Sequence, residues 1–299
     1  MPNEILNLLL ATQALEIAPP FRPFWYTSGT IGPFYLNAHY LYGSRPKAEE
    51  LLHFIDQNQR DRATLIPELF RRVQENYSED AGYRAVIESV AALARNDVGV
   101  GEFEVVSGGE RRDWFFSLMV ALSLGKPALL ICKNQEVFQV TPAAEGGYRV
   151  ETSADLKGVR VLHVADLATE GSSYVRAWIP ALEKRGAKLA WAMNVIDRGQ
   201  GAEKVLEQHG VQARHLVQIG ASFFRGLQEL GYLSEQQATA LIAYHVNPRE
   251  CMKGLLLHHP EILREALRSP DAKIQGRARI LMKQNVYGFE DSFWVNLKS

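Results

Sequence analysis

Residues 161–179 read VLHVADLATEGSSYVRAWI, and this stretch decides the fold class. It opens with an apolar run typical of a buried strand, and Asp166 comes where that run ends. Small and hydroxyl residues follow at 169–173, and a helical pattern begins after them. A strand that passes through such a loop into a helix presents backbone N–H groups to an anion. The alternative is an ordinary strand–loop–helix corner with Ser172 or Ser173 as the N-cap.

Short apolar runs and helical patterns alternate on both sides of this stretch. Strands are predicted near residues 103–109, 127–133, 158–166, 188–197 and 214–220. Apolar strands that alternate with helices predict an α/β protein, with a parallel sheet covered by helices on both faces. Ligands of such sheets bind at the carboxyl ends of the strands. Around PAAEGG the residues alternate between apolar and polar, which predicts a hairpin.

The two ends of the chain read as helical. Residues 4–17 carry an apolar stripe, and within 46–96 apolar residues recur at intervals of three and four. Ser234 and Gln237 fit a capping box within the helical tail. These changes predict three segments, which are an N-terminal hood at 1–97, a core at 98–221 and a helical C-terminal extension at 222–299.

Composition narrows the class of protein. The 299 residues carry a formal net charge of −1, and this lack of a basic excess argues against nucleic acid as a partner. Cys132 and Cys251 lie too far apart to suggest a metal site or a disulfide framework. No run approaches the roughly 18 apolar residues of a membrane span, and the first residues lack the basic start of a signal peptide. We therefore expect a cytoplasmic protein that does not bind membranes.

Four segments in order resemble type I phosphoribosyltransferases, most closely orotate phosphoribosyltransferase, over roughly residues 20–220. They are TSGTIGPFYLN (27–37), VVSGGERRDWFFSLMVALSLGKPALLICKN (105–134), VLHVADLATEGSSY (161–174) and NVIDRGQGAEKVLEQHGVQARHLVQI (194–219). The resemblance implies the type I phosphoribosyltransferase fold and transfer of a phosphoribosyl group from phosphoribosyl diphosphate (PRPP) to orotate or a similar base. It also implies release of pyrophosphate, Mg²⁺ bound through PRPP, and a homodimer.

The resemblance also assigns roles at the sugar and its phosphate. Asp166 would hold a ribose hydroxyl and take part in catalysis, because carboxylates stabilise the oxocarbenium-like sugar of the transition state. The 5′-phosphate would be wrapped by Thr169, Gly171, Ser172 and Ser173.

At the other end of PRPP, the resemblance places the backbone of Gly108 and Gly109 against the pyrophosphate, with help from Lys133. Phe34 would lie against the base, and Arg198 would pair with an anionic group on it. These positions describe a site for a strongly anionic substrate and a small base.

Two adjacent arginines, Arg111 and Arg112, follow the glycines and precede a helix. Arginines at the carboxyl end of a strand suit bidentate binding of phosphate or carboxylate. The alternative is a charged helix start in which they pair with Glu110 and Asp113. We add both arginines to the PRPP-binding set.

The chain departs from the family pattern at several positions. Ala165 stands where the motif has its first acid, Thr27 replaces a lysine, and residues 134–152 contain no lysine or histidine. Glu170 stands where the family has a neutral residue. It could supply the missing charge and act in catalysis, or mark a site that no longer accepts the phosphate. Two alternatives to the enzyme follow, namely an inactive PRPP- or nucleotide-binding regulator and a structural protein whose helical extension binds a partner.

Overall fold

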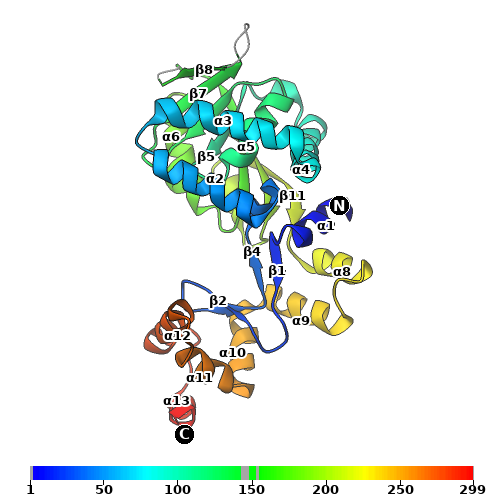
Figure 1. The fold of residues 1–299 in the computed structure, drawn as a ribbon, viewed down its shortest axis with the longest axis vertical. Helices are drawn as coiled ribbons and strands as arrows, with labels where there is room; N and C mark the ends of the chain where they lie inside the picture. The colour runs from blue at the N-terminus through cyan, green and yellow to red at the C-terminus, as the bar shows by residue number, and fades with distance from the viewer. Residues whose placement is uncertain (1–2, 143–147, 153–154, 299) are drawn as a thin grey trace. The chain divides into compact units, whose positions relative to one another are not determined.

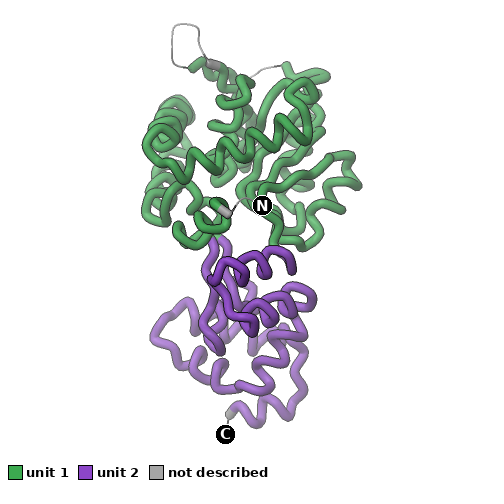
Figure 2. Tube along the Cα trace, turned by 90° about the vertical axis from the view of Figure 1, so that its right-hand side faces the viewer, with its two compact units in different colours: residues 1–14, 37–219 green, residues 15–36, 220–299 purple. Residues whose placement is uncertain are grey.

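A computed structural model describes residues 3–142, 148–152 and 155–298. The chain forms two compact units, each built from two separate stretches of sequence (Figure 2). Unit 1 contains residues 1–14 and 37–219, and unit 2 contains residues 15–36 and 220–299. These units do not coincide with the three predicted segments, because the first 97 residues contribute to both of them.

A seven-stranded sheet with the strand order β11-β10-β9-β5-β6-β7-β8 forms the centre of unit 1. Figure 1 labels β5, β7, β8 and β11 of this sheet. Five of its strands are parallel neighbours. They are β5 (Val105–Gly109), β6 (Ala128–Ile131), β9 (Arg160–Ala168), β10 (Lys188–Asp197) and β11 (Gln212–Gln218). The predicted parallel sheet is confirmed.

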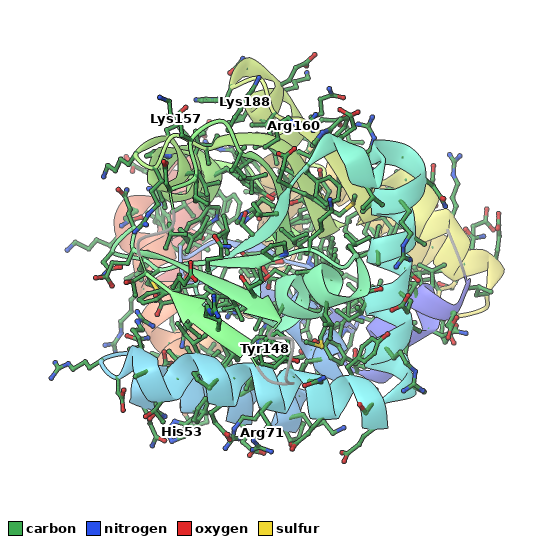
Figure 3. The ribbon with its side chains drawn as sticks, turned by 90° about the horizontal axis from the view of Figure 1, so that it is seen from above. His53, Arg71, Tyr148, Lys157, Arg160 and Lys188 are labelled. Carbon is green, nitrogen blue, oxygen red and sulfur yellow. The ribbon has the colours of Figure 1, made fainter. Side chains whose placement is uncertain are left out.

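The two remaining strands of this sheet form the antiparallel pair β7 (Val137–Pro142) and β8 (Tyr148–Glu151). They confirm the strands of the predicted hairpin, whose turn at 143–147 lies outside the described residues. Tyr148 lies beside α3 (Arg62–Glu79), where its ring contacts Phe70 and its hydroxyl donates to Oε1 of Gln74 at 3.1 Å (Figure 3). The sheet is therefore mixed, and this pair is tied to a covering helix.

Helices cover the sheet on both faces. On one face α5 (Trp114–Ser123) packs on β5 and β9, and α3 and α4 (Ala81–Leu93) pack on α5. On the other face, η4 (Tyr174–Trp178) and α6 (Ile179–Glu183) share a buried cluster with Val161 and Ala165 of β9. The remaining helical segments of unit 1 are α1 (Asn3–Ala11), η1 (Ala38–Tyr42), α2 (Arg45–Asn58), η2 (Ala94–Val98), η3 (Val100–Glu102) and α7 (Ala202–Gln208).

Local sequence sets where the covering helices begin. Ser44, Asp61 and Asp80 precede α2, α3 and α4, and each side chain accepts a backbone N–H from the first turn of its helix. Side-chain oxygens at this position satisfy N–H groups that lack a helical partner. The predicted helical character of residues 46–96 is confirmed.

Unit 2 combines two short antiparallel strand pairs with helices. The pairs are β1 (Leu15–Ile17) with β4 (Phe34–Leu36), and β2 (Phe24–Trp25) with β3 (Ile31–Gly32). Ser234 and Gln237 form the predicted capping box at the start of α9. The helices are α8 (Ala221–Glu229), α9 (Glu235–Val246), α10 (Pro248–His258), α11 (Glu261–Leu267), α12 (Ala272–Gln284) and α13 (Asp291–Lys298).

The predicted helix at 4–17 is wrong over residues 12–17. The helix ends at Ala11, where Thr12 donates its hydroxyl to the carbonyl of Leu8 at 2.7 Å. Gln13 then adopts a positive φ of 59°, and residues 15–17 pair with β4. The helix and the strand both bury apolar side chains, so the apolar pattern continues through residues 15–17 and does not show where the helix ends. No described helix is long and apolar enough to cross a membrane.

Candidate functional site

The carboxyl ends of four neighbouring parallel strands, β6, β5, β9 and β10, meet at one edge of the sheet in unit 1. This edge is where ligands of parallel sheets bind. All but one of the predicted site residues lie on these strand ends or in the turns that follow them. They are Gly108, Gly109, Arg111, Arg112, Lys133, Asp166, Thr169, Glu170, Gly171, Ser172, Ser173 and Arg198.

Asp166 is a buried acid near the end of β9, with 7% of its surface exposed. Its backbone N–H donates to Oδ1 of Asp113 at 3.0 Å. Its own Oδ2 is buried and has no hydrogen-bond partner among the described residues. Burial and the negative charge of Asp113 raise the pKa of Asp166 well above its usual value, and Arg112 opposes this shift. A buried acceptor without a partner is suited to a ligand hydroxyl.

The loop at 169–173 leads from β9 into the helical turn η4. Gly171 adopts a positive φ of 74°, and a Cβ there would lie 3.3 Å from Cγ1 of Val205. Ser172 and Ser173 are exposed, and Ser173 makes no side-chain capping bond to the helix that follows. The Ser173 hydroxyl is therefore not used as a helix cap, which leaves it available to a ligand.

Glu170 lies in the same loop and is exposed. Its carboxylate forms no hydrogen bond or ion pair with any described residue. Ala165, in contrast, is 3% exposed and belongs to the buried cluster under η4 and α6. Successive side chains of a strand point to opposite faces, so Ala165 and Asp166 serve different faces of the sheet.

The glycines that end β5 are required by close packing. A Cβ on Gly108 would lie 2.2 Å from Oγ of Ser117, and one on Gly109 would lie 2.2 Å from the ring of Trp178. The N–H of Gly109 already donates to Oδ2 of Asp113 at 3.0 Å. The predicted contact of this N–H with pyrophosphate would therefore require Asp113 to release it.

The two arginines after these glycines have different surroundings. Arg111 pairs with Asp56 of α2, whereas Arg112 is exposed and influences the titration of Asp166. Glu110 is buried, and its Oε2 accepts the N–H of Lys133 at 3.0 Å and a guanidinium N–H of Arg62 at 3.3 Å. The alternative in which both arginines pair with Glu110 and Asp113 is therefore wrong.

Lys133 and Arg198 mark the two flanks of the edge. The side chain of Lys133 is exposed just after β6. Arg198 is half-buried just after β10, and its backbone N–H donates to the carbonyl of Ala168 at 2.8 Å. Asp197 beside it is buried and accepts the N–H of Gly199 at 2.7 Å. Positively charged residues thus follow β6 and β10, the strands on either side of the β5–β9 pair.

Phe34 is the one predicted site residue that lies outside unit 1. Its ring is 2% exposed and packs against Phe224 and Tyr244, with ring centroids 5.6 Å away in both cases. Contact between this ring and a base would require it to leave that packing. The base-binding role of Phe34 stays a prediction.

Sequence reasoning missed the buried polar groups beneath the edge. Asp113 accepts two backbone N–H groups, and its Oδ2 lies 3.5 Å from Nε2 of His163. Nδ1 of His163 in turn lies 2.8 Å from Oγ of Ser107, so this buried histidine is hydrogen-bonded within the core. His39 is also buried, and this burial, together with the positive charges of Arg112 and Arg111, lowers its pKa to about 3. The one available signal was that Asp113 follows the glycine pair by four residues.

Comparisons with known proteins agree with this architecture. The orotate phosphoribosyltransferase of Pyrococcus furiosus is 29% identical over 223 residues, which cover 75% of this chain and 96% of that protein. The enzyme of the same name from Pyrococcus horikoshii is 24% identical and covers 75% and 94%. The one from Cereibacter sphaeroides is 28% identical over 221 residues and covers 72% and 77%. No protein-family model matches the sequence.

Two solved structures show the fold. UMP synthase of Leishmania donovani superposes with a TM-score of 0.53 at 16% identity and covers 81% of this chain and 41% of that chain. Orotate phosphoribosyltransferase of Francisella tularensis superposes with a TM-score of 0.50 at 17% identity and covers 80% and 96%. The predicted fold class is confirmed by these structures.

Proposed function

We propose that this chain, which has the type I phosphoribosyltransferase fold and is related in sequence to orotate phosphoribosyltransferases, binds PRPP at the carboxyl edge of its sheet. It transfers the phosphoribosyl group to orotate or a similar acidic base and releases pyrophosphate. The observation that carries the proposal is the arrangement around β9. A buried acid with an unpartnered oxygen, Asp166, stands before a loop whose serine hydroxyls are exposed.

The chemistry of PRPP matches the groups at this edge. Its ribose hydroxyls need acceptors, and the carboxylate of Asp166 offers one. Its 5′-phosphate needs N–H and hydroxyl donors, which residues 169–173 supply at the start of a helical segment. Its diphosphate needs positive charge, and Arg112 and Lys133 are exposed on the adjoining turns. A single bound substrate could use all three sets of groups at once.

Transfer breaks the bond between the sugar C1 and the pyrophosphate and forms a bond from C1 to a ring nitrogen of the base, whose proton leaves to the pyrophosphate or to water. Positive charge develops on the sugar during this exchange, and a carboxylate next to the ribose stabilises it electrostatically. Asp166 would supply this negative charge from one side of the sugar. Arg112 and Lys133 would stabilise the departing pyrophosphate. Arg198 would pair with the acidic group of the base.

Magnesium is assigned to the substrate, because diphosphate oxygens bind Mg²⁺ well. When bound, the ion would neutralise charge on the leaving group. The described residues contain no group of three or more His, Cys, Asp or Glu that could hold a metal ion by themselves. We therefore propose no protein ligand for it.

Calorimetry with PRPP and Mg²⁺, followed by pyrophosphate release with orotate and a panel of other bases, tests the proposal. We expect PRPP binding and orotate-dependent release of pyrophosphate. Asp166→Asn should weaken PRPP binding by about 10²-fold or more, since it removes charge at a buried contact. If PRPP binds but no base causes release of pyrophosphate, the chain is a PRPP-binding protein and not an enzyme of this class. No PRPP binding by the native chain would refute the proposed site.

A matched control separates loss of the site from loss of the fold. Asp271 caps α12 in unit 2, where its side chain accepts the N–H groups of Lys273 and Ile274. Asp271→Asn carries the same chemical change outside the proposed site. It should leave PRPP binding within about twofold of the native value, because Asp271 is not among the residues proposed to contact PRPP.

A further inference from the structure

Asp113 holds the position that normally caps a helix, yet its carboxylate does not cap α5. Asp61 and Asp80 hold the same position before α3 and α4, and both accept N–H groups from their own helices. The carboxylate of Asp113 is directed instead to the sheet, where its residue is 8% exposed. Burial of a carboxylate is costly unless other groups hydrogen-bond to it, so the contacts of Asp113 outside its own helix explain its position.

Each oxygen of Asp113 accepts one backbone N–H, and the two donors belong to different strands. Oδ2 accepts from Gly109 at the end of β5, and Oδ1 accepts from Asp166 near the end of β9, both at 3.0 Å. One side chain thereby connects the glycine turn that precedes Arg112 to the strand that carries the acid. Movement of either strand end would cost a charge-assisted hydrogen bond.

Below this carboxylate, side chains restrict its position further. Nε2 of His163 lies 3.5 Å from Oδ2 of Asp113, and Nδ1 of the same ring lies 2.8 Å from Oγ of Ser107. The His163 ring is fully buried, stacks on Trp178 and meets Tyr174 edge-on. Rigid packing of this kind is how a supporting residue holds a functional group in place.

Asp113 also restores a second acid to the site. The family pattern has two adjacent acids, and this chain has Ala165 in place of the first, on the opposite face of β9. The carboxylate of Asp113, at the start of α5, accepts the backbone N–H of Asp166, so that a second acid lies beside Asp166. The charged and titratable groups near Asp166 include Asp113 and Arg112 from the α5 side and Tyr174 after the loop. Asp197 of β10 also acts on Tyr174, and His163 of β9 lies beside Asp113.

We infer that Asp113 is a positioning residue, which fixes the ends of β5 and β9 relative to each other and supplies the second negative charge beside Asp166. It acts through the backbone of Gly109 and through Asp166, and it makes no contact with substrate of its own. The inference deepens the proposed function and rests on it for the reaction. The connection between the strands stands on the geometry alone.

The first experiment needs no ligand. Amide hydrogen exchange is compared between the native protein, Asp113→Asn and Asp113→Ala, with Asp271→Asn as the control. In the alanine variant the amides of Gly109 and Asp166 should exchange at least about tenfold faster than the other amides of β5 and β9, because both lose a buried acceptor. Asn keeps one acceptor oxygen, so its effect should be smaller at one of the two amides. Unchanged exchange at both amides in Asp113→Ala would overturn the positioning role.

The second experiment measures the charge. The carboxyl carbon of Asp166 is titrated by NMR in the ligand-free native protein and in Asp113→Asn. The negative charge of Asp113 contributes to the raised pKa of Asp166, so the pKa should fall when that charge is removed. A purely structural role of Asp113 would leave the pKa in place, and that result would overturn the second half of the inference.

The third experiment adds PRPP with Mg²⁺ across a range of pH. Asp113→Asn should weaken binding at neutral pH by about 10- to 10²-fold, since a misplaced group costs of this order. It should also shift the loss of binding on acidification to lower pH. Failure of the native protein to bind PRPP would refute the proposed function, while the two ligand-free experiments would still decide the role of Asp113. If Asp113→Asn binds PRPP with the affinity and pH dependence of the native protein, the positioning role of Asp113 is refuted.

Discussion

The ring of Phe34 lies 5.6 Å from the ring of Phe224, although 34 and 224 belong to opposite ends of the chain. Tyr244 meets the same ring edge-on, and Phe34 and Phe224 are almost fully buried. A segment that resembles a base-covering element is therefore packed with helices that sequence reasoning treated as an appendage. Residues 15–36 and the tail therefore belong to one compact unit.

Phe34→Ala should lower the free energy of unfolding of unit 2 by about 3–5 kcal/mol, because it leaves a cavity in a closely packed core. Denaturant unfolding followed by tryptophan fluorescence measures this loss. Phe34→Leu keeps most of the volume and should cost less. A role at the base predicts another pattern, in which Phe34→Leu raises the Michaelis constant for the base and leaves the unfolding curve unchanged.

Gly32→Ala should destabilise unit 2 by about 1–3 kcal/mol through overpacking. An added Cβ would lie 2.3 Å from the hydroxyl of Tyr26 and 2.6 Å from that of Tyr244. Gly276→Ala is the matched control, because nothing lies within 4 Å of its added Cβ in the interior of α12. It should stabilise the protein by roughly 0.5–1 kcal/mol through helix propensity. Equal midpoints of urea unfolding for Gly32→Ala and Gly276→Ala would contradict the close packing around Gly32.

Arg112→Gln should weaken PRPP binding by about tenfold or more, whereas Arg111→Gln should weaken it much less. Arg112 is exposed beside Asp166, and Arg111 is already paired with Asp56. The two neighbours undergo the same change, so the difference isolates the surroundings of each guanidinium. Calorimetry at two salt concentrations measures it, with a smaller salt dependence expected for Arg112→Gln. The opposite ranking would place the diphosphate near Arg111.

Glu170→Gln should tighten PRPP binding by roughly threefold to tenfold. Its exposed carboxylate stands in the loop proposed to hold the 5′-phosphate, and like charges a few ångströms apart in water repel by about 1 kcal/mol. Steady-state kinetics should show a lower Michaelis constant for PRPP and an unchanged kcat. A fall in kcat with the Michaelis constant unchanged would instead give Glu170 a part in the chemistry.

His39→Gln should remove part of the sensitivity of the fold to acid. Burial, with the charges of Arg112 and Arg111, lowers the pKa of His39 to about 3 from an ordinary value of 6.5. Between these values the unfolded chain binds a proton that the folded chain does not, so stability is lost as the pH falls. The slope contributed by His39 is about 1.4 kcal/mol per pH unit. Urea unfolding from pH 7 to pH 4 should show a shallower decline for the variant, and parallel declines would contradict it.

Much of the fold could be predicted because its determinants are local. The run at 128–131 has no polar residue and the run at 161–164 has one, His163. This pattern is typical of strands buried on both faces, and the two runs form β6 and β9. The residues at or just after the carboxyl end of each strand, such as Asp166 and Lys133, then gather at one edge of a parallel sheet. The resemblance to a family could be detected for the same reason, because most of its motifs are short stretches at the ends of strands.

What sequence alone determined about this protein is therefore its class of fold and the list of groups at that edge. Tertiary structure decided which groups face one another. Asp113 reaches Asp166 across 53 positions, and only the packing of α5 on β5 and β9 brings these two acids together. Arg111 turns to Asp56 while its neighbour stays exposed, and Phe34 packs in unit 2 with helices from the tail. Contacts of this kind depend on long-range packing, which leaves no periodic trace in the sequence.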